Sequence, residues 1–434
     1  MIQKDDKRQI WSWAMYDFAN SAFTTLLVTF IYGTFFTKSI ADNEILGTQY
    51  WSWAISFTAI VVALLSPILG AIADNWGSRK RIMLVSTLVC VAATALLFFP
   101  QQGQVLLALT LFIIANIAFE IGTVFCNAYL AELSSEERIG KVSGMAWGLG
   151  YIGGLLALIL ALVFFVQTEQ PILGFSTEYG ENIRATNLLV ALWFLIFSLP
   201  IFIWIKDKHN TAKKPLLLVV KNSFDNLKTT FKELSLYGKI FHFLLARLVY
   251  NDALITIFAF GGIYAATTIG FSFEEIIILG IVLNVMAGIG AFIFGYLEDG
   301  KGSEKVILWS IVFLMIACII AFLAPELPGL FQFIFGGNAI PDWFNSKNLF
   351  WVSGILIGLF SGPNQSASRT YMARLTPSEK RNEFFGFYAF SGKMTAFVGP
   401  FLFGLTTSYF DTQQAGLIMI FILFFVGYKL MKRL

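Results

Sequence analysis

GAIADNWGSRKR, from Gly70 to Arg81, recurs later in the chain in a related form, GYLEDGKGSEK, from Gly295 to Lys305. Each copy is a charged turn, punctuated by glycines, between two long apolar segments. The shared positions are Gly70, Asp74, Gly77, Ser78 and Lys80 in the first copy, and Gly295, Asp299, Gly302, Ser303 and Lys305 in the second. Self-similarity at about half the chain length indicates two copies of one structural unit. We therefore predict two homologous halves.

The composition places the chain in a membrane. Of its 434 residues, 57% are hydrophobic and 13% are charged, which is far more apolar than a soluble domain of this size. At about 20 residues per spanning helix, twelve apolar segments are present. They lie near residues 11–37, 50–72, 82–100, 104–131, 142–166, 185–205, 240–266, 273–297, 305–324, 349–373, 384–407 and 411–430. We predict an all-α integral membrane protein with two pseudo-symmetric six-helix halves, residues 1–205 and 240–434.

The placement of Lys and Arg predicts the orientation in the membrane. Most of the 30 cations lie in the two terminal tails and in the loops that follow even-numbered segments, whereas Lys38, Arg184 and Lys347 lie on the opposite side. By the positive-inside rule both termini are cytoplasmic. The Lys-rich linker 206–239 carries apolar residues at helical spacing, which predicts an amphipathic helix on the inner membrane face. The N-terminus lacks a small-residue cleavage site, so we expect an uncleaved first span and a bacterial inner membrane.

The repeated turn resembles the signature loop, roughly GxxxDxxGxR, between the second and third helices of the major facilitator superfamily. Glycines allow helices to approach closely, and an Asp at a helix end can face the positive N-terminus of another helix. The resemblance implies a cytoplasmic gate that closes in the outward-open state, with Glu132 as a partner of Arg79. Its residues are Gly70, Asp74, Gly77, Arg79, Glu132 and Asp299. A solvated hairpin that does nothing except set the topology is the alternative.

Three further motifs are similar to the vacuole-effluxer branch of that superfamily. They are YDFANSAF at residues 16–23, YND at 250–252 and GLGYIGG at 148–154. In fungi this branch is associated with export of amino acids from the vacuole, which implies an amino-acid-like substrate. GLGYIGG also resembles the GPxxGG motif of antiporters. Because Leu149 and Gly150 stand where that motif has Gly and Pro, exchange chemistry is left open.

Ionisable side chains inside apolar segments are costly to bury and mark functional sites. Here they are accompanied by amide side chains on helical faces of the first, fourth, seventh and tenth segments, which line the central cavity in the superfamily that this chain resembles. We predict a substrate or ion-coupling site made of Asp17, Asn20, Glu120, Asn127, Arg247, Asn251, Asp252, Asn364, Arg369 and Lys393.

The depth of these residues separates their roles. Glu120 and Lys393 lie near the middle of their segments, where a substrate or coupling ion binds, although they could instead pair with each other at rest. Arg369 either lines the cavity or snorkels to the inner interface. For Asp17, Arg247 and Asp252, a structural ion pair or an inner gate is as consistent with the sequence as direct coupling.

These residues predict a secondary transporter rather than an enzyme. A cavity of mixed charge suits a small zwitterion such as a neutral amino acid, with efflux and proton coupling as candidate features. A lipid-like or sugar substrate is the second reading. A non-transporting sensor and a membrane-embedded enzyme are alternatives of other classes. No metal, cofactor or nucleic acid is expected as a partner, and we expect a monomer in the lipid bilayer.

Overall fold

A computed structural model describes residues 4–42, 44–76, 79–205, 225, 229, 237–335, 341, 343–396 and 398–434. Within these residues the protein is helical, without a β-strand. Nine of the described helical segments are long and apolar enough to cross a membrane. The remaining three spans are α4, which starts with three consecutive cations, α14, which carries a polar stripe, and the pair α15 and α16, which is broken. The predicted all-α fold of twelve spans is confirmed.

The first half contains six spans, several of which continue through short π-helical turns. They are α1 (Lys7–Ala22) with η1 (Phe23–Phe30), α2 (Tyr32–Phe35) and η2 (Phe36–Ile40); α3 (Glu44–Trp76); α4 (Arg79–Leu96); α5 (Val105–Ala128) with α6 (Leu130–Leu133); α7 (Ile139–Ala161) with η3 (Leu162–Val166); and α8 (Glu181–Trp204).

The second half repeats this order and adds one short helix, α13. Its elements are α10 (Gly238–Tyr264) with η7 (Ala265–Ile269); α11 (Phe273–Lys301); α12 (Ser303–Leu323); α13 (Leu327–Phe335); α14 (Ser346–Leu375); α15 (Arg381–Lys393) with α16 (Val398–Phe410); and α17 (Gln413–Met431). The predicted amphipathic helix of the linker falls almost wholly outside the described residues.

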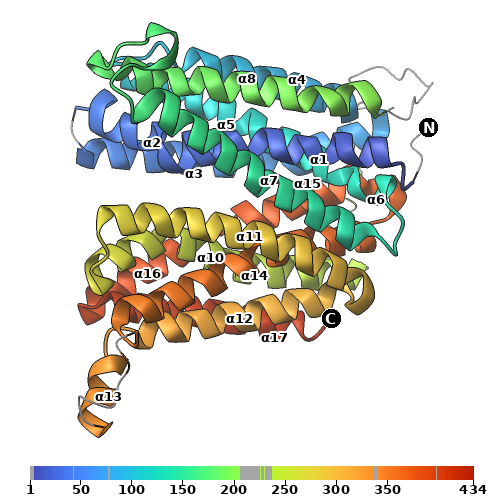
Figure 1. Cartoon of the computed structure of the whole chain (residues 1–434). Helices are drawn as coiled ribbons and strands as arrows, with labels where there is room; N and C mark the ends of the chain where they lie inside the picture. The colour runs from blue at the N-terminus through green and yellow to red at the C-terminus, as the bar shows by residue number, and fades with distance from the viewer. Residues whose placement is uncertain are drawn as a thin grey trace.

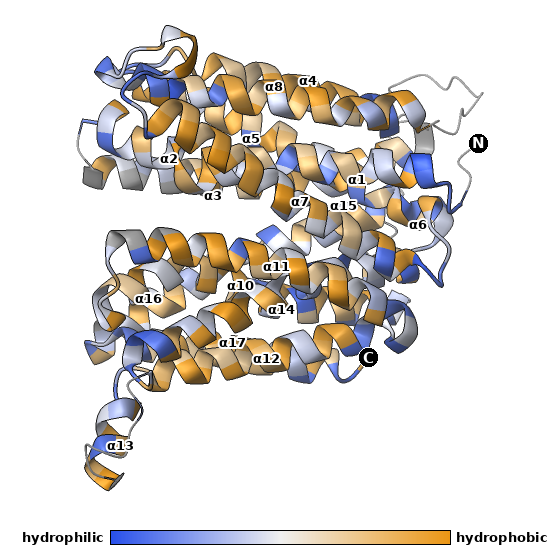
Figure 2. Ribbon diagram, in the orientation of Figure 1, coloured by the Kyte–Doolittle hydropathy of each residue, from blue (hydrophilic) through white to orange (hydrophobic). Residues whose placement is uncertain are grey.

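The two halves lie side by side, with both termini at the same end of the molecule, here called the terminal end (Figure 1). Helices α4 and α8 lie on the outside of one half, and α12 and α17 on the outside of the other (Figure 1). Their outward surfaces are apolar (Figure 2), with exposed side chains such as Leu88, Leu192, Ile316 and Ile422. An apolar surface of this extent is stable in contact with lipid rather than with water.

Inside the first half, two of the sequence motifs pack against each other. A Cβ added at Gly153 of α7 would overlap the backbone carbonyl of Phe18, and one added at Gly150 would crowd the backbone of Asp17. Since small residues let helices approach closely, GLGYIGG brings α7 directly onto the YDFANSAF stretch of α1. The glycine run therefore determines where Asp17 lies.

The halves meet through two equivalent helix crossings, α3 with α15 and α7 with α11. At the first crossing Gly70 lies against the backbone of Asn382, and Gly386 against Pro67. At the second, Gly295 lies against Gly144. The first glycine of each copy of the repeated turn thus packs on the corresponding helix of the other half. Both crossings lie toward the terminal end, and the ribbons diverge toward the opposite end (Figure 1).

The eleventh span differs from the prediction of one continuous helix over 384–407. Helix α15 ends at Lys393 and α16 begins at Val398. Pro400 accounts for the break, because a proline removes a hydrogen bond and clashes inside a helix but is tolerated in a first turn. The break leaves Lys393 at the end of a helix in the middle of the span.

Candidate functional site

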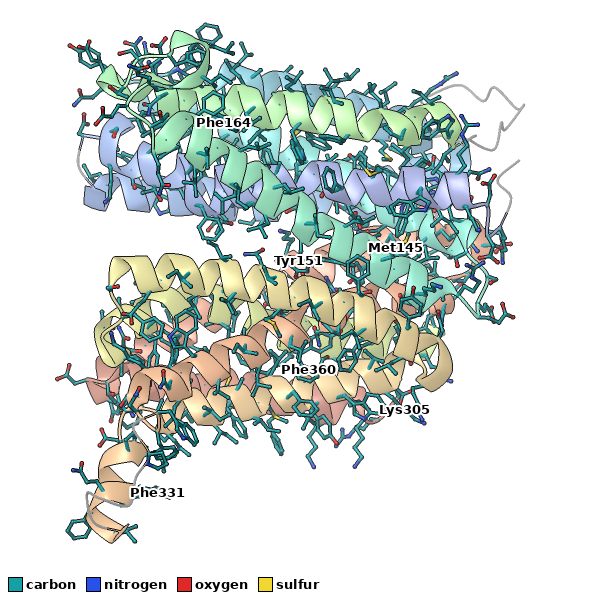
Figure 3. The ribbon with its side chains drawn as sticks, viewed as in Figure 1. Met145, Tyr151, Phe164, Lys305, Phe331 and Phe360 are labelled. Carbon is teal, nitrogen blue, oxygen red and sulfur yellow. The ribbon has the colours of Figure 1, made fainter. Side chains whose placement is uncertain are left out.

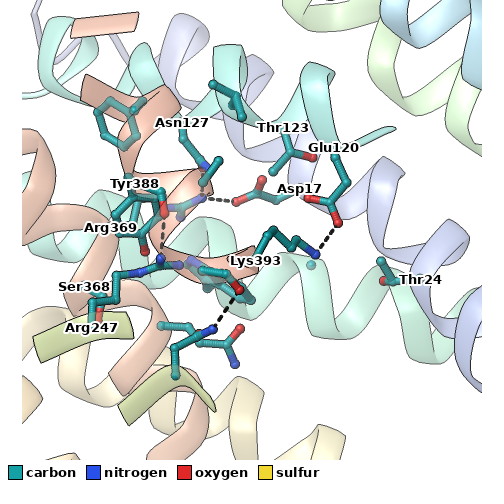
Figure 4. Close-up of a pocket in the computed structure, with 18 of the residues that line it drawn as sticks. Asp17, Thr24, Glu120, Thr123, Asn127, Arg247, Ser368, Arg369, Tyr388 and Lys393 are labelled. Carbon is teal, nitrogen blue, oxygen red and sulfur yellow. Dashed lines mark hydrogen bonds and ion pairs between the residues drawn. The ribbon is translucent and has the colours of Figure 1, made fainter. Parts of the chain in front are cut away.

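A cavity of about 360 Å³ lies between the halves (Figure 4). Its walls come from α1, η1, α5 and α7 of the first half and from α10, α14 and α15 of the second. The predicted site residues that line it are Asp17, Asn20, Glu120, Asn127, Arg247, Asn251, Asn364, Arg369 and Lys393. Asp252, the remaining one, is buried behind the wall. Among the described residues, no group of three or more His, Cys, Asp or Glu side chains could hold a metal ion.

An ion pair crosses this cavity. Lys393 Nζ on α15 donates to Glu120 Oε1 on α5 at 2.6 Å (Figure 4). The two side chains remain 33% and 18% exposed, so the pair is open to solvent from the cavity. Of the two roles left open by the sequence, pairing with each other is therefore the arrangement in this state, at a place where a solute can still reach both charges.

Arg369 forms a second ion pair deeper in the wall. Its Nη1 donates to Asp17 Oδ2 at 2.6 Å and to Asn127 Oδ1 at 3.3 Å, while Nε and Nη2 donate to the hydroxyl and the carbonyl of Ser143. The guanidinium carbon also lies 5.5 Å from the centre of the Trp147 ring. Arg369 is 2% exposed and does not snorkel to an interface. One side chain of α14 thereby joins α1, α5 and α7 of the other half.

Arg247 is held within its own half. Its Nη1 donates to the Tyr388 carbonyl at 2.6 Å and to Ser391 Oγ at 2.9 Å, and its guanidinium lies 3.6 Å over the Tyr388 ring. One turn along α10, Asn251 Nδ2 donates to the Gly392 carbonyl at 3.2 Å. These contacts tie α10 to α15 directly before the break.

At the terminal end, each aspartate of the repeated turn binds a helix N-terminus of the opposite half. Asp74 accepts from the backbone amides of Asn382 and Glu383, at the start of α15. Asp299 accepts from the amides of Gly140 and Lys141, at the start of α7, at 2.8 and 2.9 Å. A carboxylate there satisfies free amide groups and interacts with the positive end of the helix dipole. Each copy of the repeated turn therefore caps a helix of the other half, and we call these two contacts the cross-caps.

Cations extend this network. Arg79 Nη2 donates to Glu132 Oε2 at 2.9 Å, the partner that the resemblance implied, and Arg381 of the other half lies 3.3 Å from Glu132 Oε1. Arg374 lies 3.5 Å from Asp299. Glu132 thus faces a cation from each half. Gly77, also predicted in the gate, lies outside the described residues.

Sequence reasoning missed the aromatic part of the cavity wall. Phe119, Trp147, Phe385 and Tyr388 line it together with Tyr250, whose hydroxyl lies 2.7 Å from Ser368 Oγ. The signal was weak because the chain has 46 Phe residues, most of which a lipid-facing surface can explain. Gln365 Nε2 on α14 donates to the hydroxyl of Tyr151 on α7 at 3.3 Å, so these two helices also meet here. Figure 3 shows Tyr151 on the part of α7 beside the second half.

Two helical halves around a central polar cavity form the fold of the major facilitator superfamily, and solved structures with this fold superpose on the protein. The human organic anion transporter MFSD10 (TETRAN) superposes with a TM-score of 0.75 at 12% identity, over 99% of this chain and 100% of that one. A variant of the E. coli fucose:proton symporter FucP gives 0.70 at 15% identity, over 98% and 97%.

Within that class, residues 43–434 match the family model described as vacuole effluxer Atg22 like, and the chain belongs to this family. It is 28% identical over 420 residues to the uncharacterized MFS-type transporter YxiO of Bacillus subtilis (strain 168), covering 96% of this chain and 92% of that protein. Autophagy-related protein 22 of Vanderwaltozyma polyspora is 22% identical over 434 residues, with 91% and 78% covered. The predicted branch is confirmed, and with it the prediction of a membrane transporter rather than an enzyme.

Proposed function

We propose that this protein is a secondary active transporter for a small zwitterion of the amino-acid type, that it works by alternating access, and that a proton is its coupling ion. The observation that carries the proposal is the Glu120–Lys393 pair. It presents one negative and one positive charge to the same cavity, one from each half of the protein.

A zwitterion can replace both members of this pair at once. Its ammonium group would bind Glu120 and its carboxylate Lys393, so that neither protein charge loses a partner. A purely anionic or cationic solute would leave one of the two charges without its counter-ion, which is costly in a partly desolvated site. The aromatic wall formed by Phe119, Trp147 and Tyr388 suits an apolar substituent.

Contacts between the two halves suggest to which side of the membrane the cavity opens. From the positive-inside rule we expect the terminal end in the cytoplasm. The cross-caps of Asp74 and Asp299 and the Arg369 network all lie between the cavity and that end, and they would form a closed cytoplasmic gate. The structure would then correspond to an outward-facing state. Opening inward would break these contacts while the solute stays bound between the halves.

The test is uptake of a radiolabelled amino-acid mixture into proteoliposomes, with and without an imposed proton gradient. We expect gradient-dependent accumulation that Glu120→Gln and Lys393→Met each abolish. Glu275→Gln and Lys347→Met are matched controls, because these residues form a similar pair, 2.8 Å long, away from the cavity. Normal uptake by both cavity variants would refute the proposed site. Absence of uptake by folded, inserted wild-type protein would refute the substrate class and direct the search to sugars or lipid-like solutes.

A further inference from the structure

Within the described helices, three carboxylates of α1, α5 and α10 lie around the cavity, and they are not equivalent. Asp17 has Arg369 at 2.6 Å, and Glu120 has Lys393 at 2.6 Å. Asp252 forms no ion pair within the described part of the chain, although it is 2% exposed. Its Oδ1 is buried, and the neighbouring polar group is the equally buried, neutral hydroxyl of Thr395 rather than a cation. Burying an unpaired carboxylate is far more costly than burying a neutral acid.

Asp252 lies opposite the break between α15 and α16. Thr395 belongs to the turn that separates the two helices, and a Cβ added at Gly399, in the first turn of α16, would collide with the Thr256 hydroxyl and approach the Asp252 carbonyl. The preceding residue, Asn251, reaches the cavity and donates to the Gly392 carbonyl. The Asp252 carboxyl is therefore one residue away from the cavity wall and packed on the hinge of the eleventh span.

One charged side chain, Arg247, acts on the Asp252 carboxyl among the described residues. Helix α10 packs against α14, α15, α16 and α17. Charged or titratable side chains on these five helices include Arg247 and Tyr250 on α10, Tyr388 and Lys393 on α15, Tyr409 on α16, Arg369 on α14, and Tyr428 and Lys429 on α17. Of these, Arg247 is the charged group that acts on the Asp252 carboxyl. Its donor Nη1 is engaged by the Tyr388 carbonyl and Ser391 Oγ, both on α15.

We propose that Asp252 is the proton-binding residue of this transporter and that its protonation state controls the break in the eleventh span. Asp17 and Glu120 already have cationic partners, so each would have to lose an ion pair before it could bind a proton. Asp252 has no such pair to lose. The inference rests on the proposed function in so far as the bound proton is taken to drive solute transport.

The geometry connects this proton to the solute site. In the protonated form that we propose for the state described here, Asp252 carries no charge and Arg247 binds α15. When the carboxyl O–H bond releases its proton to water, the carboxylate attracts the guanidinium of Arg247, whose charge acts on it. A guanidinium that turns toward Asp252 gives up its hydrogen bonds to Tyr388 and Ser391, and α15 loses its anchor directly before Lys393. The Glu120–Lys393 pair would then respond to the proton on Asp252.

Proton binding can be measured without knowing the solute. Infrared difference spectra of purified protein in lipid, recorded between acidic and alkaline buffer, report the C=O stretching band of protonated carboxylic acids. We expect a titrating band that is lost in Asp252→Asn and retained in the control Glu120→Gln. The proposal would be overturned by a band that survives in Asp252→Asn. It would also be overturned by a wild-type protein whose spectrum in this region does not differ between acidic and alkaline buffer.

Two further arms cover the alternatives. Thr395→Val keeps the carboxyl but removes its hydroxyl neighbour, so the Asp252 band should shift even if Asp252→Asn fails to fold; an unshifted band counts against the assignment. Sodium replacing choline in alkaline buffer should leave the spectrum unchanged, and a sodium-dependent change lost in Asp252→Asn would make this a sodium site instead.

The transport arm separates this inference from the function itself. In proteoliposomes, Asp252→Asn should still exchange internal for external amino acid but should fail to accumulate it in a proton gradient. Gradient-driven accumulation by Asp252→Asn would refute the inference and leave the transporter standing. Failure of the wild type to move any amino acid would refute the proposed substrate, while the infrared result would still decide whether Asp252 binds a proton.

Discussion

Glu120 on α5 and Lys393 on α15 form a 2.6 Å ion pair that connects the two halves of the protein across its central cavity. Both side chains are partly exposed in the cavity, whereas in the Asp17–Arg369 pair the Arg369 side chain is almost completely buried. The two pairs therefore have different expected roles. The first can be opened by a solute, and the second holds the helices below the cavity together.

If the solute separates this pair, exchanging its two charges should preserve part of the site. Glu120→Lys or Lys393→Glu alone leaves two like charges facing each other and should weaken zwitterion binding by at least about tenfold, or ~1.4 kcal/mol. The double variant Glu120→Lys with Lys393→Glu should recover part of that loss. Substrate-induced thermal stabilisation of the three proteins measures this. A double variant no better than the worse single variant would contradict the pairing role.

The cross-caps should affect conformational exchange more than binding. Asp74→Ala leaves the amides of Asn382 and Glu383 without their acceptor, a loss of about 1 kcal/mol for a cap. We expect transport to slow several-fold while substrate affinity stays nearly intact, and Asp299→Ala should behave in the same way because it removes the equivalent cap. Initial rates at several substrate concentrations separate the two effects. Weakened affinity with an unchanged maximal velocity would contradict this prediction.

Substitutions at two glycines should separate an effect on closure of the terminal end from an effect on folding. A side chain at Gly144 would collide with the backbone of α11 across the interface, whereas one at Gly290 would collide with the Leu359 carbonyl inside the second half. Gly144→Val should therefore disfavour the closed terminal end and increase thiol labelling of a cysteine placed there, with a melting temperature near that of the wild type. Gly290→Val should lower the melting temperature. The opposite assignment of effects would show that the α7–α11 contact is not a moving one.

Arg369 should not be replaceable by Lys. It uses Nε, Nη1 and Nη2 to bind Asp17, Asn127 and Ser143, and an ammonium group cannot reproduce that planar set of donors. Arg369→Ala leaves Asp17 buried without its cation, which typically costs about 3–5 kcal/mol. We expect both variants to lower the melting temperature in detergent. Stability equal to that of the wild type would indicate that Asp17 is already neutral or finds another partner.

A repeated GxxxD turn, a 57% apolar composition and polar residues at helical spacing were sufficient to predict two six-helix halves, all the charged members of the cavity wall and most of its amide side chains. They were sufficient because lipid imposes a length and an apolar surface on every span, and because buried charges stand out against that background.

The tertiary structure decided which residues pair with which. Asp17 and Arg369, or Glu120 and Lys393, come from opposite halves of the chain, and no spacing within one helix specifies contacts between helices. It also decided that α15 ends at Lys393. Asp252 is, like Asp17, an aspartate inside an apolar segment, but it has no ion pair among the described residues. The sequence by itself determined which side chains are buried in the membrane. The packing of the two halves determined which of their charges are neutralised, since that depends on distances of a few ångströms between helices far apart in the chain.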